Sequence, residues 1–292
     1  MRKFIPALMI LVATSAQAVE VKFGDLNYNM SEGEQNFQFD FGTLRAKQVA
    51  ENSDSTIRAY MVKSEYRYAL TDKFDAFIGL EYVWQAQIND GGAKTLIDSF
   101  RNPAFGASYR IFDQKDFSYN FDVEVVTKQS LFKAKNGGDT ANMYQGRSTY
   151  ELYGKFGKKW NEANEWEAGF GMIYNADGKA EQNGTKYDEE SSTDLEFKLG
   201  YQYRPVNEFM INLSAEALYV GEFQYAKNIK EDGHLDFTFG FGAKYLITEN
   251  LIGRFQFNQS RLSDFDYKNA GVKASVDSRH FNVYGAGIDY LF

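Results

Sequence analysis

The chain alternates apolar and polar residues over long stretches, and this period of two is its strongest pattern. From Leu235 to Ile247 every second residue is apolar, whereas Asp236, Thr238 and Lys244 lie in the opposite phase. Successive side chains of a β-strand point to opposite faces of the sheet. The pattern therefore predicts strands with one apolar face and one mostly polar face. The same alternation occurs in residues 117–125, 166–174 and 195–203.

The length and content of these segments favour a membrane barrel over a soluble sandwich. Segments such as 117–132 and 251–264 are much longer than the ~6 residues usual for strands of globular proteins. Their polar phase carries charges in mid-strand, where a charge needs water or a counter-charge. Aromatic residues collect at the segment ends, as expected at two membrane interfaces. We therefore predict an all-β fold, a transmembrane antiparallel up-and-down β-barrel.

The connections between the segments alternate strictly between short and long, which predicts the number of strands. Outer-membrane barrels join their strands by short periplasmic turns and longer external loops. The short connections are 71–73, 113–116, 161–164, 205–208 and 248–250. The long connections are about 47–55, 89–100, 133–143, 177–190, 225–233 and 265–277. The twelve predicted strands are 36–46, 56–70, 74–88, 101–112, 117–132, 144–160, 165–176, 191–204, 209–224, 234–247, 251–264 and 278–292.

The first residues have the pattern of a secretory signal peptide. Arg2 and Lys3 precede an apolar run from Phe4 to Ala13, and Ala16-Gln17-Ala18 is a cleavage pattern of small residues. The run is shorter than the ~20 residues of a membrane-spanning helix, although an anchor that stays in place is the alternative. The predicted parts are a signal peptide over 1–18, a periplasmic lead-in over 19–35 and the barrel over 36–292.

The composition supports a barrel and excludes two classes of function. The chain has 20 Tyr and 26 Phe, yet its mean hydropathy is only −0.49, which suits a barrel with an apolar outer face and a wet interior. The absence of Cys excludes thiol chemistry. The formal charge of −8, without a basic stripe, excludes binding to nucleic acid.

The last residues resemble a known targeting signal. Tyr284, Ala286, Ile288, Tyr290 and Phe292 alternate in one phase and finish on a terminal Phe. This pattern is similar to the C-terminal strand signal of Gram-negative outer-membrane proteins. The resemblance implies an outer-membrane location, contact with outer-membrane lipid and lipopolysaccharide, and recognition of Tyr290 and Phe292 by the barrel-assembly machinery.

A second resemblance covers about a sixth of the chain, in two pieces. Residues 66–74 read Tyr-Arg-Tyr-Ala-Leu-Thr-Asp-Lys-Phe, and residues 102–111 read Asn-Pro-Ala-Phe-Gly-Ala-Ser-Tyr-Arg-Ile. They resemble the hairpin pattern of the "MetA-pathway of phenol degradation" group of outer-membrane proteins. The resemblance implies passage of small organic compounds and assigns no functional residue.

The polar phase of the predicted strands supplies the candidate lumen-lining residues. Counting from the short turns places most cations in a layer near those turns and most carboxylates in a middle layer. The candidates are Lys63, Glu65, Arg67, Glu81, Arg110, Asp122, Glu124, Glu151, Lys155, Glu196, Lys198, Glu216, Lys244 and Arg254. The glycines in this phase leave space in the lumen or lie under neighbouring aromatic rings. They include Gly79, Gly106, Gly157, Gly169, Gly171, Gly200, Gly240, Gly242, Gly285 and Gly287.

These charges have two compatible interpretations. They form ion pairs that tie the wall together, or they form an electrostatic constriction that selects solutes. We expect an outer-membrane channel for passive diffusion of small solutes through a narrow charged lumen, with the solute unknown. The alternative is a structural or interaction barrel whose lumen is closed by ion pairs.

Catalysis is the third and weakest possibility, and we predict that the protein is not an enzyme. Outer-membrane hydrolases pair a His with a Ser, often as His-x-Ser on one strand face. His234 and His280 lack that neighbour, because positions 236 and 282 are Asp and Asn. Acidic residues near the predicted external rim suit a protease or a cation site, but solvation is their default role. We predict no catalytic residue, no metal and no cofactor.

Overall fold

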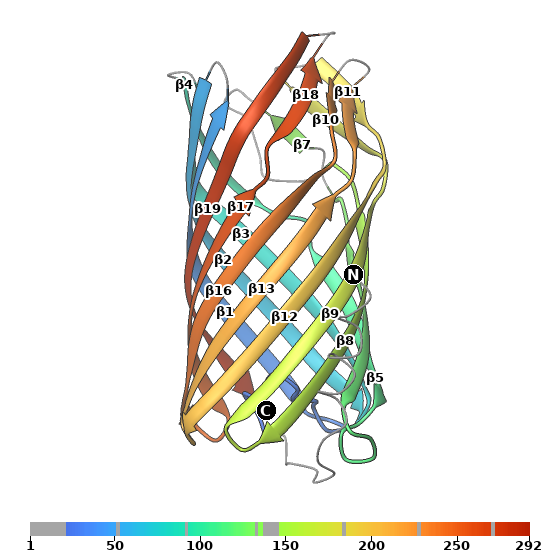
Figure 1. The fold of residues 1–292 in the computed structure, drawn as a ribbon, viewed down its shortest axis with the longest axis vertical. Helices are drawn as coiled ribbons and strands as arrows, with labels where there is room; N and C mark the ends of the chain where they lie inside the picture. The colour runs from blue at the N-terminus through green and yellow to red at the C-terminus, as the bar shows by residue number, and fades with distance from the viewer. Residues whose placement is uncertain are drawn as a thin grey trace, which may run out of the picture.

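A computed structural model gives the fold of the chain (Figure 1). It describes residues 22–50, 53–90, 93–131, 134–136, 146–182, 185–226, 229–269 and 272–292. The predicted signal peptide, residues 1–18, lies outside this described part. No helix among the described residues is long and apolar enough to cross a membrane.

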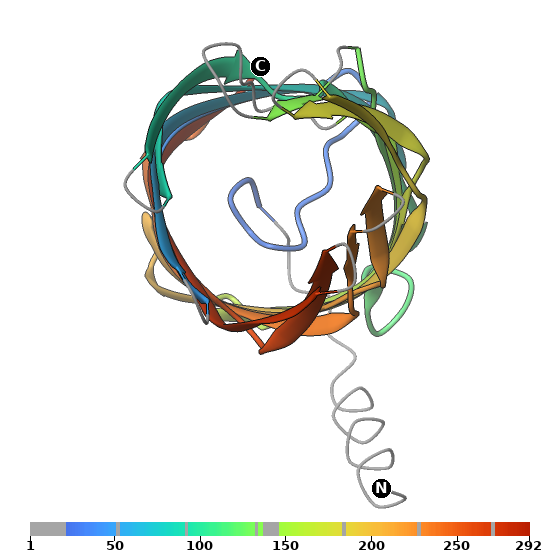
Figure 2. The same ribbon diagram turned by 90° about the horizontal axis from the view of Figure 1, so that it is seen from above.

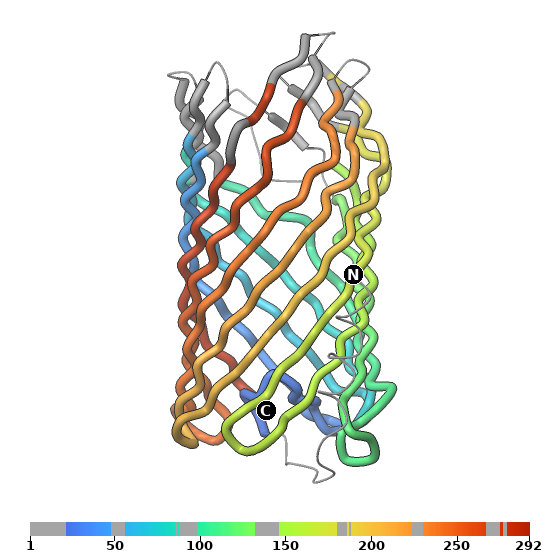
Figure 3. The backbone as a smooth tube through the Cα atoms, viewed as in Figure 1, coloured from blue at the N-terminus to red at the C-terminus, as the bar shows by residue number. Residues whose placement is uncertain are grey.

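Twelve long antiparallel strands of the described chain form one closed barrel, which confirms the predicted fold class. The strands run at a tilt to the barrel axis (Figure 3). Pairing of the first strand with the last closes the wall, from Asn36 opposite Leu291 to Ala50 opposite Val276. The order around the barrel is β1 (Gln35–Ala50), β2 (Ser53–Thr71), β3 (Phe74–Asp90), β5 (Ala104–Phe112), β6 (Asn120–Lys128), β8 (Thr149–Asn161), β9 (Asn164–Asn175), β12 (Ser192–Val206), β13 (Phe209–Val220), β16 (His234–Thr248), β17 (Leu251–Leu262) and β19 (Val272–Leu291).

Several of the predicted long connections contain short strands. The short strands extend the hairpins beyond the barrel wall, because two neighbouring extended segments satisfy each other's backbone groups. One set continues the barrel sheet and another forms a separate sheet of three strands. The first set is β4 (Ala93–Phe100), β14 (Phe223–Ala226), β15 (Ile229–Glu231) and β18 (Phe265–Asn269). The second set is β7 (Ala134–Asn136), β10 (Gly178–Gln182) and β11 (Thr185–Glu189). We call the end of the barrel that carries these short strands the long-loop end. The opposite end, which carries the short turns, is the short-turn end.

The predicted strand over 101–112 begins later than expected. Its first residues, Arg101 to Pro103, interrupt the wall between β4 and β5. Proline has no N–H to donate to a neighbouring strand, which disfavours it inside a sheet. The interruption is still held at both sides, because Arg101 N donates to Glu81 O at 2.8 Å and Gln129 N donates to Pro103 O at 3.0 Å.

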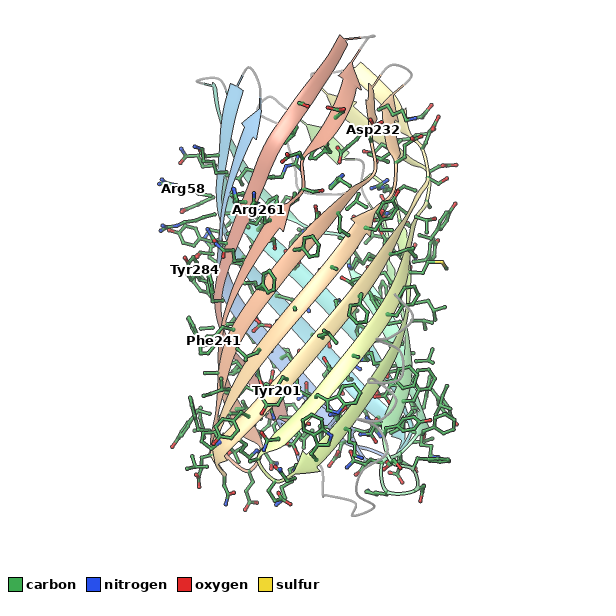
Figure 4. The ribbon with its side chains drawn as sticks, viewed as in Figure 1. Arg58, Tyr201, Asp232, Phe241, Arg261 and Tyr284 are labelled. Carbon is green, nitrogen blue, oxygen red and sulfur yellow. The ribbon has the colours of Figure 1, made fainter. Side chains whose placement is uncertain are left out.

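The two faces of the wall differ as the alternation predicts. Along β16, Phe237, Phe239 and Phe241 are exposed on the outside, with Phe239 at 63%. Figure 4 shows the same for Phe241 and, on β19, for Tyr284. Among the described residues, the buried polar and charged side chains outnumber the buried apolar ones. A soluble globule shows the reverse, so the apolar face of this wall suits lipid.

Candidate functional site

Ion pairs line the middle of the inner face. Lys63 and Lys198 each pair with a carboxylate on their own strand, Lys128 of β6 pairs with a carboxylate of β8, and Arg101, between β4 and β5, pairs with a carboxylate of β3. The pairs and their N···O distances are Lys63–Glu65 at 3.5 Å, Arg101–Glu81 at 3.1 Å, Lys128–Glu151 at 2.5 Å and Lys198–Glu196 at 2.8 Å. Glu216 Oε2 lies 3.9 Å from Lys198 Nζ, so a second carboxylate shares this cation.

These pairs surround a cavity inside the barrel, which we call the central cavity. Its volume is about 360 Å³, and β2, β3, β5, β6, β8 and β12 contribute to its lining. The cationic side chains in the lining are Lys63, Arg67, Arg101, Lys128 and Lys198. Seven of the predicted lumen residues line this one space: Lys63, Glu65, Arg67, Glu81, Glu124, Glu151 and Lys198. Four others on the same strands, Arg110, Asp122, Lys155 and Glu196, do not line it.

Arg67 links the central cavity to the part of the barrel nearer the short turns. Its guanidinium lies 2.7 Å from Asp75 and 3.6 Å from Glu124, which belongs to β6. Lys155 Nζ also lies 3.4 Å from Glu124. The Arg67 guanidinium stacks over the Phe77 ring, 4.3 Å from its centroid. These contacts fix the side chain of Arg67 although it faces the barrel interior.

Two further arginines pair with carboxylates on the inner face. Arg110 Nε and Nη2 donate to the two oxygens of Asp122 at 2.7 and 2.9 Å, a bidentate geometry. Arg254 Nη2 lies 3.1 Å from Asp40 and 2.8 Å from Asp289, so it joins β17 to β1 and β19 across the seam of the barrel.

The segment before β1 lies inside the barrel, as Figure 2 shows, and the side view of Figure 3 places it at the short-turn end. We call residues 22–34 the plug segment. Asp25 pairs with Lys159 Nζ at 2.8 Å and also with Arg204. All three charged groups are buried. A buried ion pair of this kind is costly to break, because one lost partner leaves a buried charge without compensation.

Backbone groups of the plug segment bind side chains of the wall. Leu26 N and Asn27 N donate to the two oxygens of Glu165 at 2.8 and 3.2 Å. Arg110 Nη2 donates to Asn27 O at 3.1 Å, and Lys244 Nζ donates to the Gly24 carbonyl at 2.9 Å. The segment is therefore held from β5, β9 and β16, three widely separated parts of the wall.

The plug segment ends in contacts to β2 and to the turn that follows it. Glu32 N donates to Asp72 Oδ1 at 2.8 Å, and Gly33 N donates to Ala69 O at 2.9 Å. Gly24 and Gly33 have φ values of +95° and +87°, a backbone region that favours glycine. Both residues therefore allow bends that other residues disfavour.

The side chain of Tyr28 packs the plug segment against the barrel wall. Tyr28 Oη donates to Glu34 Oε2 at 2.7 Å, and the Tyr28 ring lies against a small apolar cluster that includes Met30 and Leu291. Burial, with the neighbouring Glu34 carboxylate, raises the pKa of Tyr28. The hydroxyl therefore stays a hydrogen-bond donor to a higher pH than that of a free tyrosine.

Three inward glycines lie beneath other side chains. A Cβ at Gly157 would overlap the amide of Asn27, and a Cβ at Gly171 would overlap the ring of Tyr153. Gly106 has the same relation to Phe77. Of the two interpretations of the inward glycines, coverage by an aromatic ring describes Gly106 and Gly171, whereas Gly157 is covered by an amide.

The fold compares well with solved outer-membrane proteins. An outer membrane channel from Pseudomonas putida F1 matches with a TM-score of 0.62 and 13% identity, over 94% of this chain and all (100%) of that one. The chain has the fold of a Gram-negative outer-membrane β-barrel. The translocator domain of the autotransporter NalP from Neisseria meningitidis matches with a TM-score of 0.51 and 11% identity, over 91% of this chain and 90% of that one. The NanC porin matches with a TM-score of 0.50 and 10% identity, over 86% and 98%. No family model and no curated protein sequence matches the chain.

The histidine that faces the interior of this outer-membrane barrel has an aromatic and acidic surrounding. The His234 ring stacks on Phe265, with 4.4 Å between the centroids. Its Nδ1 lies 3.6 Å from Glu231 and its Nε2 lies 3.5 Å from Asp236. Within the part of the chain that the structure describes, no group of three or more His, Asp and Glu side chains can hold a metal ion.

The C-terminal residues of the outer-membrane barrel lie at the seam where the wall closes. Phe292 N donates to Gln35 O at 2.8 Å. The rings of Tyr290 and Phe292 meet edge to face, 4.5 Å apart, and both are exposed on the outer face. The predicted assembly signal is thus an aromatic pair at the end of the last strand.

Sequence reasoning missed the side chains that hold the plug segment. It described residues 19–35 only as a lead-in, and it left Lys159 and Glu165 out of the lumen set. Two signals were present. The lead-in carries Gly24 next to the acidic Asp25, and Lys159 and Glu165 flank a short turn in the inward phase.

Proposed function

We propose that this barrel is an outer-membrane channel that lets small solutes diffuse passively through a narrow charged lumen. The central cavity, lined by charged side chains from several strands, is the observation that carries the proposal. Charged groups inside a membrane protein need water or counter-charges, and a water-filled interior also passes solutes. Two of the solved structures with this fold are named a channel and a porin, which supports the same role.

The plug segment forms the narrowest part of the proposed route, and the short-turn end faces the periplasm. A second cavity of about 70 Å³ lies between the plug segment and the wall, with Asn27, Arg67 and Lys155 in its lining. Arg67 lines the central cavity as well. In the proposal, solutes pass from the central cavity along Arg67, and movement of the plug segment widens the exit. The proposal involves no catalytic step.

Single-channel recording in planar lipid bilayers tests the proposal. We expect discrete openings of the purified barrel, and we expect neutralisation of Glu81, Asp122 and Glu124 (E81Q, D122N and E124Q) to change the conductance. Asp113→Asn, in the turn between β5 and β6, is the control and leaves the conductance unchanged. A folded barrel without openings, or a triple variant with unchanged conductance, contradicts the proposal.

A second candidate is a structural or interaction barrel with a closed, ion-paired interior. The observation that favours it is the buried group of Asp25, Lys159 and Arg204, which fastens the plug segment. The same recordings separate the two functions when Asp25→Asn is included, because this change removes the charge that both cations bind. Absence of openings in both proteins would favour the closed barrel.

The remaining proposed partners concern the surface and the assembly of the barrel. The exposed aromatic and aliphatic side chains of the outer face would contact outer-membrane lipid and lipopolysaccharide. The aromatic pair of Tyr290 and Phe292 would be read by the barrel-assembly machinery before the seam between β1 and β19 closes.

A further inference from the structure

We infer that the central cavity is a binding site for a small organic anion, with the carboxylate as its recognised group. The inference rests on the proposed channel function and names the class of solute that the same site takes. The net charge of −8 points the other way, toward a cation. The arrangement of the ion pairs decides between these two classes.

In each of the four pairs around the central cavity, the cation is the more exposed partner and the carboxylate is the less exposed one. The cationic side chains are 41–52% exposed, whereas their carboxylate partners are 7–25% exposed. A solute inside the cavity therefore has more contact with ammonium and guanidinium groups than with the carboxylates, although the latter line the cavity too. Counting charges along the sequence cannot reveal this order, because both members of a pair lie in the same phase.

The wall holds the carboxylates in this recessed position. Glu151 accepts from Tyr153 Oη at 3.3 Å in addition to its pair with Lys128. Glu65 accepts from Arg67 Nη2 at 3.3 Å in addition to its pair with Lys63. Each pair is thus a dipole whose positive end points into the cavity. The potential of such dipoles falls off with distance, so a solute in contact with the cations is attracted even though each pair is neutral.

The cations retain donors for a ligand. An ammonium group has three N–H donors and a guanidinium has five, so one carboxylate neighbour, or two at Lys198, uses only part of them. Three lysines and Arg101 line the same space, so a carboxylate there has ammonium donors and a guanidinium fork available together. A volume of about 360 Å³ is near the lower limit of ligand pockets, which restricts the ligand to a small molecule.

The lining also has a surface for the uncharged body of such a ligand. Ala104, Val126 and the ring of Tyr153 face the cavity between the charged groups. Lys198 Nζ lies 4.9 Å from the centroid of the Tyr153 ring, so an aromatic face and a cation are adjacent. Four carboxylates, Glu65, Glu81, Glu124 and Glu151, also line the cavity, against five cations, so the lining has one positive charge in excess.

Reversal-potential measurement in a tenfold KCl gradient tests the inference, on the wild type and on Asp25→Asn. We expect chloride to be more permeant than potassium, and we expect added acetate to reduce the chloride current. Replacing Lys63, Lys128 and Lys198 by Gln should lower the chloride-to-potassium permeability ratio by about twofold or more. Glu151→Gln, which removes the recessed charge of one pair, should raise the ratio. Lys73→Gln and Lys115→Gln, in two short turns, are the matched controls and should leave it unchanged.

The outcomes separate the inference from the function on which it rests. Openings in neither protein contradict the proposed channel. Openings that pass potassium better than chloride overturn the anion site but not the channel. A chloride-to-potassium permeability ratio that the three lysine substitutions leave unchanged does the same. Heat-modifiable migration in gels shows whether each variant is folded. If the triple variant does not fold, the single variants Lys128→Gln and Glu151→Gln replace it, and they should change the permeability ratio in opposite directions.

Discussion

At the scale of single residues, glycine and charge positions on the inner face determine what fits inside the barrel. Gly157 is the clearest case, because the Asn27 amide of the plug segment occupies the place of its missing side chain. Gly79 lies in the same inward phase, but there an added Cβ would be 3.5 Å from Ala104 Cβ, an ordinary contact. The two positions form a matched pair of test and control.

We predict that Gly157→Ala releases the plug segment and that Gly79→Ala does not. Overpacking of this kind costs about 1–3 kcal/mol, which raises the released population by roughly 5- to 150-fold. Cleavage of the folded barrel by a glutamyl endopeptidase at Glu32 and Glu34 measures this population. Equal cleavage rates for the two variants would contradict the prediction, because they would show that an added Cβ at position 157 does not displace Asn27.

The paired charges of the inner face show what the sequence can reveal about the site. The period of two assigns Lys63, Glu65 and Glu151 to the inward phase. In the structure, Lys63 pairs with Glu65, and Glu151 pairs with Lys128. It cannot show which member of a pair is exposed, because that depends on hydrogen bonds such as the one from Tyr153. Contacts between Asp25 and Lys159 are likewise hidden, since 134 positions separate the two residues.

At the scale of elements, strand alternation is the property that the sequence determines best. The strand predicted over 234–247 is β16, His234–Thr248, because its phase is unbroken by proline. The strand predicted over 101–112 is shorter than expected because Pro103 cannot donate to a neighbour. The plug segment lacks any periodic signal, so its position inside the barrel is set by tertiary contacts alone.

Cysteine substitution along β16 tests the assignment of the two faces. The chain has no Cys, so each introduced thiol is the only one. In lipid vesicles we predict that a charged, water-soluble thiol reagent modifies Cys at 236 and 238 and spares Cys at 237 and 239. The inner positions meet water, whereas the outer positions replace Phe237 and Phe239, which face lipid. Modification of 237 and 239 in place of 236 and 238 would contradict the orientation of the wall.

At the scale of the whole molecule, the fold combines a closed wall with a segment that lies inside it at one end. Pairing of β1 with β19 removes the open sheet edges, and the plug segment continues directly into β1. Ion pairs of Asp25 attach the segment to β8 and β12, and hydrogen bonds hold it from β5, β9 and β16. These contacts are separate from the backbone pairing that closes the wall, so the proposed movement of the segment leaves that pairing in place.

The central claim is that solutes cross the barrel interior and that the plug segment controls their passage. A cysteine pair at positions 27 and 157 tests it, because an added Cβ at Gly157 lies 2.6 Å from Asn27 Cγ, which brings the two Cβ atoms within reach of a disulfide. The single variants Asn27→Cys and Gly157→Cys are the controls.

Single-channel conductance of this Asn27→Cys/Gly157→Cys protein, before and after reduction, is the most direct measurement. We predict a low conductance while the disulfide holds the plug segment and an increase of several-fold when a reductant breaks it. The single variants should not respond to the reductant. A folded double variant whose conductance is the same in both states, or which never opens, would contradict the account.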